Sequence, residues 1–441
     1  MSFVSVDVDL AKKSYYAATV QRTKRLPQFE ERVSCDVAVV GGGLAGLSAA
    51  IELAERDYSV VVLEAKEVDW GASGRSGGQA LAGLACDQAT IEAQVGMTEA
   101  RRIWAMTLEA IALIQERCSR FNIECDWQSG YLTLAVNARK AKALRQWQDH
   151  MQAEYAFQTQ WIDNADMASW IDSPRFHSGV FDATSGHLNP LKYSFGLARA
   201  ADSLGVKIFE HSAITALKHG DTVRLKTELG ELRASAVLLA GNVYLQGLAP
   251  VLQYRIMPAG TYIVTSERLD PALANKLVRC KAAVCDTNFV LDYFRPTPDH
   301  RMFYGGRVSY STSTPRDLEA SMQKRMAATF PQLKNTRIEY SWGGFVDISM
   351  NRAPDFGRLQ PLAGSVNARG AANVYYLQGF SGHGLALTGL AGKLVAEAID
   401  GNAERFDTFS RIQHRSFPGG KWLRTPALVA GMAYYRLRDM L

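Results

Sequence analysis

The alternation of apolar and polar positions along the chain begins with a β–α–β unit near the N-terminus. Apolar runs over 37–40 and 60–63 flank a glycine-rich turn and a helix-like stretch over 44–56. Continuous apolar runs of this length between turn signals are typical of strands that are buried on both faces of a parallel sheet. The pattern therefore predicts a strand, a helix and a second strand parallel to the first.

Beyond this unit the pattern changes between helical and strand-like several times. Further helices are predicted over 99–120, 140–157, 191–204, 315–330 and 385–399, and further strands over 130–136, 206–210, 214–218, 222–227, 236–240 and 374–377. The segment over 256–342 is mostly strand-like and rich in aromatic residues. A cluster of short antiparallel strands lies between two strand–glycine turn–helix segments, which indicates that the chain returns to its first sheet.

Three glycines in the first turn have the spacing of a dinucleotide-binding fingerprint. Gly41 permits the tight turn, Gly43 lets the backbone approach a pyrophosphate, and Gly46 lets the helix pack closely on the strand. The helix that follows presents unpaired N–H groups and the positive end of its dipole to the phosphates. Glu64 ends the second strand, where a carboxylate binds ribose hydroxyls and repels a 2′-phosphate. NAD and FAD both fit this fingerprint.

Two later segments extend the predicted site. A loop after Glu64 is rich in small residues and lies between Trp70 and an apolar stretch over 80–85, which favours a ligand-facing loop over a flexible surface loop. It contains Ala72, Ser73, Gly74, Arg75, Ser76, Gly77, Gly78 and Gln79. A second strand, glycine turn and helix over 374–399 can bring another positive helix end to the same ligand.

Composition and charge exclude several classes of protein. With 441 residues, of which 47% are hydrophobic and 21% charged, the chain can form two or three globular cores. A net charge of +5 that is spread along the chain argues against a nucleic-acid partner. The N-terminus lacks the pattern of a signal peptide, and polar residues and glycines interrupt the apolar runs over 234–254 and 371–392. We therefore expect a cytoplasmic protein without integral membrane association.

The six cysteines form no CxxC pair and have no histidine at metal-ligand spacing. They are expected to be reduced thiols, and no metal site is predicted.

Together these segments resemble the D-amino-acid-oxidase-like FAD-dependent oxidoreductases and, within them, the gamma-glutamylputrescine oxidase group. The matching segments span nearly the whole chain, at 14–18, 39–46 with Glu64, 71–79, 186–190, 342–344, 352–355 and 379–384. The glycine motifs carry the resemblance to the superfamily. The N-terminal arm, the Arg75 loop and the stretch over 417–441 carry the resemblance to the group.

The resemblance implies an α/β (α+β) two-domain fold, with a Rossmann-like FAD-binding domain and an antiparallel β-sheet substrate domain that covers the flavin. The expected divisions are an N-terminal arm over 1–32, an FAD-binding domain from 33–95, 160–250 and 350–441, and a substrate domain from 96–159 and 251–349.

The resemblance also implies how FAD is held. In the family, the loop matching 72–79 lies beside the isoalloxazine, the segment matching 211–214 meets the adenine, and the turn matching 382–384 approaches the pyrimidine side of the flavin. Besides the fingerprint and the loop, the expected contacts are Leu44, Ala45, Ala65, Ala213, Ile214, Ala240, Gly241, Gly382, His383 and Gly384. Ile348 stands where some relatives carry a cysteine bound to FAD, and the loop has no histidine, so non-covalent FAD is predicted.

The implied reaction is transfer of hydride from an amine-bearing carbon to flavin N5, followed by hydrolysis of the imine. An ammonium has no lone pair to expel hydride, so the amine must react in its neutral form, which an apolar aromatic pocket favours by desolvation. The aromatic candidates for this pocket are Tyr262, Tyr293, Tyr304, Trp342 and Phe380.

The charged candidates leave alternatives open, and no single base is compelling. His383 is a candidate for proton transfer, although positioning of the flavin is preferred. Arg75 either stabilises the anionic reduced flavin or pairs with a surface acid. Arg307 and Arg352 are candidates for binding a distal carboxylate, and a structural salt bridge fits each of them equally well.

The sequence thus predicts an FAD enzyme that oxidises an amine such as gamma-glutamylputrescine, with oxygen as acceptor, and releases aldehyde, ammonia and hydrogen peroxide. The alternatives are an oxidase or dehydrogenase of secondary amines or amino acids, sarcosine-like or D-amino-acid-like, and a flavin-binding subunit without turnover. An amphipathic segment over 426–441 is expected to pack on its own domain; attachment to a membrane surface would instead favour electron transfer to quinone.

Overall fold

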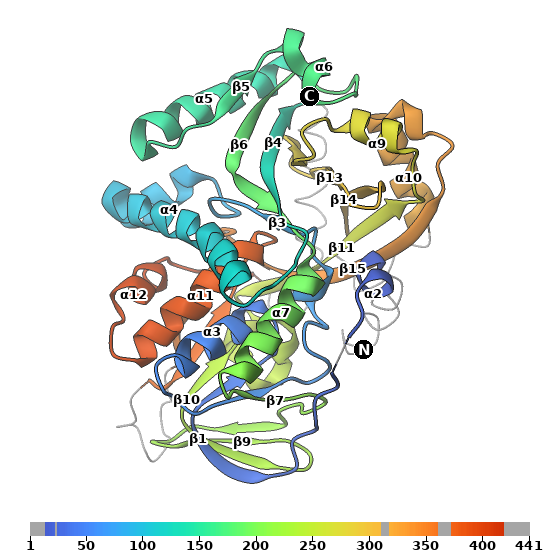
Figure 1. The fold of residues 1–441 in the computed structure, drawn as a ribbon. Helices are drawn as coiled ribbons and strands as arrows, with labels where there is room; N and C mark the ends of the chain where they lie inside the picture. Colours follow the sequence, from blue (N-terminus) through green and yellow to red (C-terminus); the bar gives the residue numbers. More distant parts are fainter. Residues whose placement is uncertain (1–13, 23, 310–316, 360–371, 419–441) are drawn as a thin grey trace.

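Two β-sheets organise the part of the chain that the computed structural model describes, which comprises residues 14–22, 24–309, 317–359 and 372–418. In Figure 1 the first sheet and its helices form the lower part of the molecule, and the second sheet forms the upper part. The predicted α/β architecture, with a Rossmann-like sheet and a largely antiparallel second sheet, is confirmed.

The first sheet has the strand order β16-β17-β10-β1-β2-β7. Its strands are β1 (Arg32–Val40), β2 (Val60–Leu63), β7 (Lys207–Phe209), β8 (Ala216–Lys218), β9 (Val223–Lys226), β10 (Glu231–Leu239), β16 (Asp355–Leu359) and β17 (Val374–Gln378). The strands from β17 to β7 run parallel, β16 is an antiparallel edge, and β8 and β9 extend β10 in antiparallel fashion. Val37 pairs with Val60 on one side and Ala236 on the other, so the predicted β–α–β unit lies at the centre.

Helices pack against the first sheet, whose central strands are buried. The helices α3 (Leu44–Ala54), α4 (Gln88–Arg120), α7 (Pro190–Ser203) and α11 (Gly384–Ile399) share one hydrophobic core with it, and α12 (Glu404–Ser410) packs beside β16 and α11. Every residue of β2 and β17 is buried. Burial on both faces explains why these strands read as continuous apolar runs.

The second sheet has the order β15-β11-β14-β13-β12-β4-β6-β3, with β5 paired to β6. Its strands are β3 (Gln79–Ala80), β4 (Gln128–Ala135), β5 (Gln160–Ile162), β6 (Ser178–His187), β11 (Ile256–Ser266), β12 (Ala283–Asp286), β13 (Tyr293–Pro296), β14 (Met302–Ser309) and β15 (Ile338–Ser349). The helices α6 (Met167–Trp170), α9 (Pro271–Leu277) and α10 (Leu318–Thr329) share a core with this sheet, and α5 (Ala138–Tyr155) packs on β4 and β6. The short helix α2 (Tyr15–Thr19) lies beside β11 and β15 (Figure 1). The helix α8 (Pro250–Gln253) directly precedes β11 in the chain.

The sheets divide the chain differently from the predicted domains. The strands β5 and β6 belong to the second sheet, although 160–250 was assigned to the FAD-binding domain. The helix α4 packs on α11 and the first core, although 96–159 was assigned to the substrate domain. Gly96, with φ 78° and ψ 162°, has a non-helical backbone, so α4 consists of two helical segments that meet at a kink, and the predicted helix over 99–120 corresponds to the second segment.

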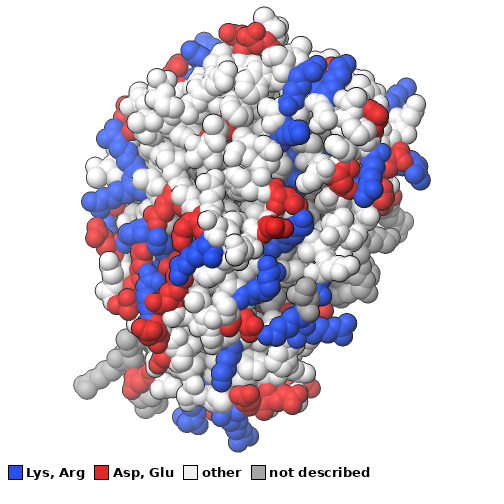
Figure 2. Space-filling model, in the orientation of Figure 1, with Lys and Arg blue, Asp and Glu red and all other residues white. Residues whose placement is uncertain are grey.

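The long apolar runs of the sequence form buried elements of the first sheet and its surroundings. Residues 234–254 contribute to β10 and α8, and the described part of 371–392 contributes β17, the glycine turn and most of α11. In the ranges that the structure describes, no helix combines the length and apolar character needed to cross a bilayer. Figure 2 shows basic and acidic side chains interspersed over one face of the molecule. The predicted amphipathic segment over 426–441 lies outside the described residues.

Candidate functional site

A cavity of about 1990 Å³ lies between the two sheets. Residues that follow the carboxyl ends of β1, β2 and β10 line one side, and residues of β15, β11, β13 and β4 line the other. Small-molecule pockets usually measure about 300–1,000 Å³, so this cavity has room for a dinucleotide and a second ligand. Its position agrees with the rule that ligands bind beyond the carboxyl ends of parallel strands.

The glycine fingerprint forms one end of the cavity. Gly41 has φ +112°, and a Cβ added there would lie 2.8 Å from the Ala240 oxygen. A Cβ on Gly43 would lie 2.8 Å from Ser73 Oγ, so either addition would fill the cradle. Gly46 does not line the cavity. A Cβ added to Gly46 would lie 2.0 Å from the Gly41 oxygen, so the lack of a side chain at this position allows α3 to pack against the turn.

The carboxylate of Glu64 faces the same end of the cavity. Glu64 Oε2 accepts a hydrogen bond from the Gly42 N–H at 2.7 Å, and Oε1 accepts one from the Lys66 N–H at 2.8 Å. Burial raises the pKa of this carboxyl, although the two backbone bonds favour its charged form. Ala65 also contributes a backbone hydrogen bond, and because a carboxylate has about four acceptor sites, the side chain can still accept a hydrogen bond from a ribose hydroxyl.

Most of the predicted FAD contacts line this cavity. In addition to Gly41, Gly43 and Glu64, they are Leu44, Ala45, Ala65, Ala72, Ser73, Arg75, Ser76, Gly77, Gly78, Gln79, Ala213, Ile214, Ala240, Gly241, Gly382, His383 and Gly384. Gly74 does not line it, because it is packed behind the loop, where a Cβ would lie 2.3 Å from the Asp69 oxygen. The Arg75 side chain is buried, and its guanidinium lies 4.5 Å from the centroid of the Trp70 ring.

The second glycine turn is held by an acid that sequence reasoning missed. Asp347 on β15 accepts hydrogen bonds from the N–H groups of Gly379 and Phe380, the latter at 3.2 Å. Burial raises the pKa of Asp347 to about 6. The sequence signal was an acidic residue between the apolar residues Val346 and Ile348. Because Asp347 fixes the start of the turn, it also determines where His383 enters the cavity.

His383 ends this turn and precedes α11. Its Nε2 lies 3.4 Å from the Ala82 oxygen, and burial lowers the pKa of the imidazole to about 4. The ring is therefore neutral at pH 7. With Nε2–H donating to the Ala82 carbonyl, Nδ1 keeps its lone pair and can only accept a hydrogen bond.

The predicted aromatic pocket is partly wrong. Tyr293 and Phe380 line the cavity, but Tyr262, Tyr304 and Trp342 do not. Side chains alternate along a strand, and Thr261 and Ile263 face the cavity, so Tyr262 lies in the core on the opposite face of β11.

Tyr304 and Trp342, the other two aromatic residues that do not line the cavity, are also buried in the protein interior. Tyr304 stacks on Phe294, with ring centroids 5.6 Å apart, and its hydroxyl lies 2.8 Å from Thr329 Oγ1. Trp342 Nε1 donates a hydrogen bond of 3.1 Å to the Arg75 carbonyl oxygen. Trp342 thus supports the Arg75 loop from behind and does not face the substrate space.

A loop over 287–291 supplies a cavity-lining aromatic residue, Phe289, that the sequence pattern did not reveal. The acids that flank the loop, Asp286 and Asp292, both pair with Arg175, at 2.6 Å and 2.7 Å. The Asp286 N–H also donates to the Asp292 carbonyl at 3.0 Å. These contacts close the base of the loop, so a segment without regular structure presents Phe289 to the cavity in a defined position.

The two arginine candidates have different positions. Arg307 lies on β14 opposite Tyr262, and the structure describes its backbone only. Arg352 lines the cavity, and its guanidinium lies 5.7 Å from the centroid of the Phe289 ring. Among the described residues, no side chain forms an ion pair or hydrogen bond with this guanidinium. Its backbone is left-handed, with φ 59°, a conformation that is uncommon for a residue other than glycine.

The fold and the cavity together are those of a dinucleotide-binding protein, in which the fingerprint would hold the nucleotide half of the cofactor and the second sheet would face its other half. The chain belongs to the family described as DAO, FAD dependent oxidoreductase, which matches residues 36–398. FAD is therefore its cofactor, and the glycine cradle and the remaining acceptor capacity of the Glu64 carboxylate fit the nucleotide half of FAD.

Similar proteins support the same assignment. The chain is 40% identical to gamma-glutamylputrescine oxidoreductase of Escherichia coli over 97% of this chain and 98% of that protein. It is 38% identical to a probable oxidoreductase, OrdL, of Haemophilus influenzae over 97% of each chain. Among solved structures, glycine oxidase of Geobacillus kaustophilus aligns with a TM-score of 0.69 and 20% identity, covering 83% of this chain and 95% of that one.

Proposed function

We propose that this protein is an amine oxidase that acts on a gamma-glutamylated amine such as gamma-glutamylputrescine, with oxygen as acceptor, in the cytoplasm. The carrying observation is Arg352, whose guanidinium faces the cavity without an ion-pair partner among the described residues. The identity of 40% with gamma-glutamylputrescine oxidoreductase over nearly the whole chain supports the substrate class. The products are an aldehyde, ammonia and hydrogen peroxide, formed from the amine, oxygen and water.

The cavity walls favour a substrate amine in its neutral form. Bound FAD supplies the acceptor for the hydride that leaves the amine-bearing carbon. Tyr293, Phe380, Phe289 and Phe345 are aromatic residues of the cavity wall, and such a wall lowers the pKa of an amine by desolvation. His383 is neutral at pH 7 and adds no positive charge to this wall. Its contact with the Ala82 carbonyl favours a role in positioning over a role in proton transfer.

Arg352 is the candidate for the distal carboxylate of such a substrate. A guanidinium binds a carboxylate through charge-assisted hydrogen bonds, and the ring of Phe289 can hold the group in place by a cation–π contact. The structural salt bridge that was the alternative for Arg352 is absent among the described residues. This absence favours the substrate role.

Arg352→Met tests this role. A hydrogen bond to a charged group contributes about 1.5–3 kcal/mol, so KM for a carboxylated amine should rise roughly 10- to 150-fold. KM for an uncharged amine of similar length should change little. Equal effects on the two substrates would reject the role of Arg352 in substrate recognition.

Anaerobic bleaching of the flavin absorbance tests the proposed function as a whole. Gamma-glutamyl polyamines, free polyamines, N-methyl amino acids and free amino acids are added separately, and the first group is expected to bleach the flavin fastest. Peroxide formation when air is admitted is expected for an oxidase; its absence would indicate a dehydrogenase. Bleaching by free amino acids alone would reject the substrate class, and no bleaching by any amine would indicate a flavin-binding protein without turnover.

A further inference from the structure

The carbonyl groups of residues 75–78 are each held by a donor on the side of the loop away from the cavity. In order along the loop, the donors are Trp342 Nε1 at 3.1 Å, Tyr16 OH at 3.0 Å, Arg295 Nε at 3.1 Å and the Leu188 N–H at 2.8 Å. In a trans peptide the carbonyl and the following N–H point in opposite directions. The N–H groups of Ser76 and Gly77 therefore point away from Trp342 and Tyr16, on the side of the loop that lines the cavity.

This loop connects the pyrophosphate end of the cavity with the second sheet. At its start, Ser73 Oγ accepts a hydrogen bond from the Leu44 N–H of the fingerprint helix at 3.1 Å. Further on, Gly77 lies so close to the Tyr293 ring that a Cβ would be 2.8 Å from it. With the nucleotide half of FAD at Glu64 and the glycine turn, residues 75–78 would lie along its redox-active half, because they line the same cavity nearer the second sheet.

Arg295 is a buried cation behind this loop and is only 3% exposed. Its guanidinium donates to the carbonyls of Gly77 and Leu188 and to the Tyr16 hydroxyl, and it lies 4.6 Å from the Phe303 ring centroid. Among the described residues these partners are all uncharged. A buried charge without a counter-ion is unfavourable, so its positive potential is available to stabilise negative charge on a ligand in the cavity.

Tyr16 links this cation to the loop. The side chain is fully buried against Phe303 and Trp342. Its hydroxyl accepts a hydrogen bond from Arg295 Nη2 at 3.1 Å and donates to the Ser76 carbonyl at 3.0 Å. Hydrogen bonds in such a chain polarise one another, so the cation strengthens the bond that fixes the loop.

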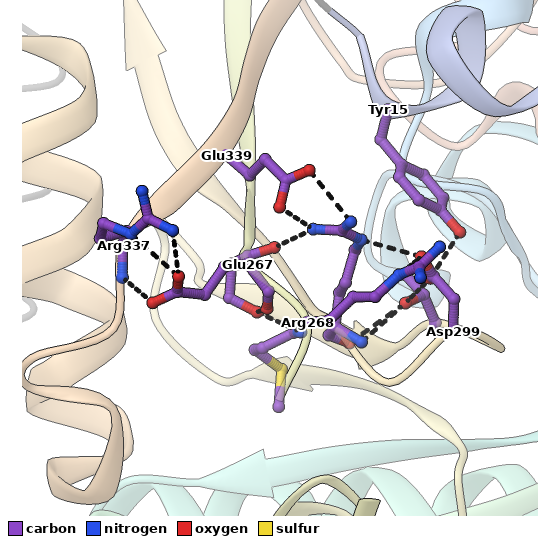
Figure 3. Close-up of polar contacts among 10 residues, drawn as sticks. Tyr15, Glu267, Arg268, Asp299, Arg337 and Glu339 are labelled. Carbon is purple, nitrogen blue, oxygen red and sulfur yellow. Dashed lines mark hydrogen bonds and ion pairs between the residues drawn. The ribbon is translucent and has the colours of Figure 1, made fainter. Parts of the chain in front are cut away.

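The neighbouring residue of the same helix has a separate partner. The Tyr15 hydroxyl donates to Asp299 at 2.8 Å, and Asp299 also pairs with Arg301 at 2.8 Å. Figure 3 shows Tyr15 extending from its helix to Asp299 within a network that also contains Arg268 and Glu339. This network docks helix α2 to the second sheet without touching the loop over 75–78.

We propose that the N-terminal arm completes the flavin site. Tyr16 is a positioning residue that, together with Arg295 and Trp342, fixes the backbone of residues 75–78 and thereby keeps the positive charge of Arg295 close to the redox-active half of FAD. The proposal requires bound FAD but not the particular amine proposed above. A failure of the substrate assignment would therefore leave it standing.

The experiment compares Tyr16→Phe with Tyr15→Phe, because each removes one hydroxyl from adjacent residues of α2. The readouts are the midpoint potential of the bound flavin and the dissociation constant for sulfite. Sulfite adds to the oxidised flavin, and nearby positive charge favours this addition because the adduct is anionic. Tyr16→Phe should lower the potential and weaken sulfite binding roughly 3- to 10-fold, as expected for the loss of one hydrogen bond. Tyr15→Phe should leave both values at those of the wild-type holoenzyme.

Arg295 provides a second arm of the test. Arg295→Met should weaken sulfite binding more than Tyr16→Phe does, and Arg295→Lys should restore part of the loss because it keeps the charge. Equal behaviour of the two tyrosine variants, or no change in Tyr16→Phe, would overturn the proposal. If Tyr16→Phe does not retain FAD, the dissociation constants of added FAD from the two apoprotein variants are compared: weaker binding by Tyr16→Phe supports the proposal, and equal binding overturns it.

Discussion

Replacing Asp347 by Asn should change how stability depends on pH. Asp347 is buried, accepts backbone hydrogen bonds from Gly379 and Phe380, and has a pKa raised to about 6 from an ordinary value of 3.8. Asn can accept the same two hydrogen bonds through its amide oxygen but carries no titratable proton. The substitution therefore removes the ionisation and keeps the turn.

The sign and size of the effect follow from the shift in pKa. The unfolded carboxyl ionises near pH 4, whereas the folded carboxyl stays protonated up to about pH 6. Between these values the folded state binds more protons, so the free energy of unfolding falls as the pH rises. One pKa unit corresponds to 1.36 kcal/mol, so the whole shift corresponds to about 3 kcal/mol, of which the wild-type protein should lose about 2 kcal/mol relative to Asp347→Asn between pH 4 and 7.

Urea unfolding of both holoproteins at saturating FAD, at several pH values from 4 to 7.5, measures this difference. All other titrating groups are shared by the two proteins and cancel in the comparison. The free energy of unfolding of the wild-type protein minus that of Asp347→Asn is expected to fall steadily with rising pH and to level off above pH 6. A constant difference across this range would refute the assignment of a raised pKa to Asp347.

Two further predictions concern the cofactor. Gly41→Ala should abolish or strongly weaken FAD binding, because the added Cβ would lie 2.8 Å from the Ala240 oxygen. Gly205→Ala is the control, because Gly205 also has a positive φ but a Cβ there would meet nothing within 4 Å. This variant should lose only about 1 kcal/mol of stability and bind FAD normally. Equal FAD affinity in the two variants, measured by fluorescence titration, would contradict the role of the cradle. Denaturation in acid should release the yellow colour into the supernatant, because FAD is predicted to be non-covalent; colour that stays with the precipitate would contradict this.

The parts of the site that depend on the backbone could be predicted from the sequence. Gly41, Gly43 and Gly46 have fixed spacing, and their roles require only the absence of a side chain at each position. The parallel strands β2 and β17 were predicted because burial on both faces leaves a continuous apolar run. Each of these signals is local, so one short stretch of sequence contains it.

The parts that depend on sheet register and distant contacts could not be predicted. Tyr262 and Tyr293 both lie in the aromatic segment, but only the register of β11 and β13 decides that Tyr262 enters the core and Tyr293 the cavity. The strand β6 was missed because SGVFDATSGH contains glycines and polar residues at positions that the second sheet buries. The role of Asp347 depends on a turn more than thirty residues away, for which no periodicity exists.

The two ends of the cofactor site therefore differ in what a substitution changes. At the proposed nucleotide end, the groups that would bind FAD are backbone amides beside glycines, so most substitutions there should either block FAD binding or leave it unaffected. At the reactive end, the backbone of residues 75–78 is held by side chains from α2, β13 and β15. A substitution among those side chains can alter the potential at the flavin while the glycine cradle and the sheet remain intact.

The proposed substrate wall is separate again, because Phe289 is held by the Arg175 ion pairs and Arg352 by its own turn. In the proposed site, substitutions that change substrate choice and substitutions that change flavin reactivity should therefore fall on different side chains.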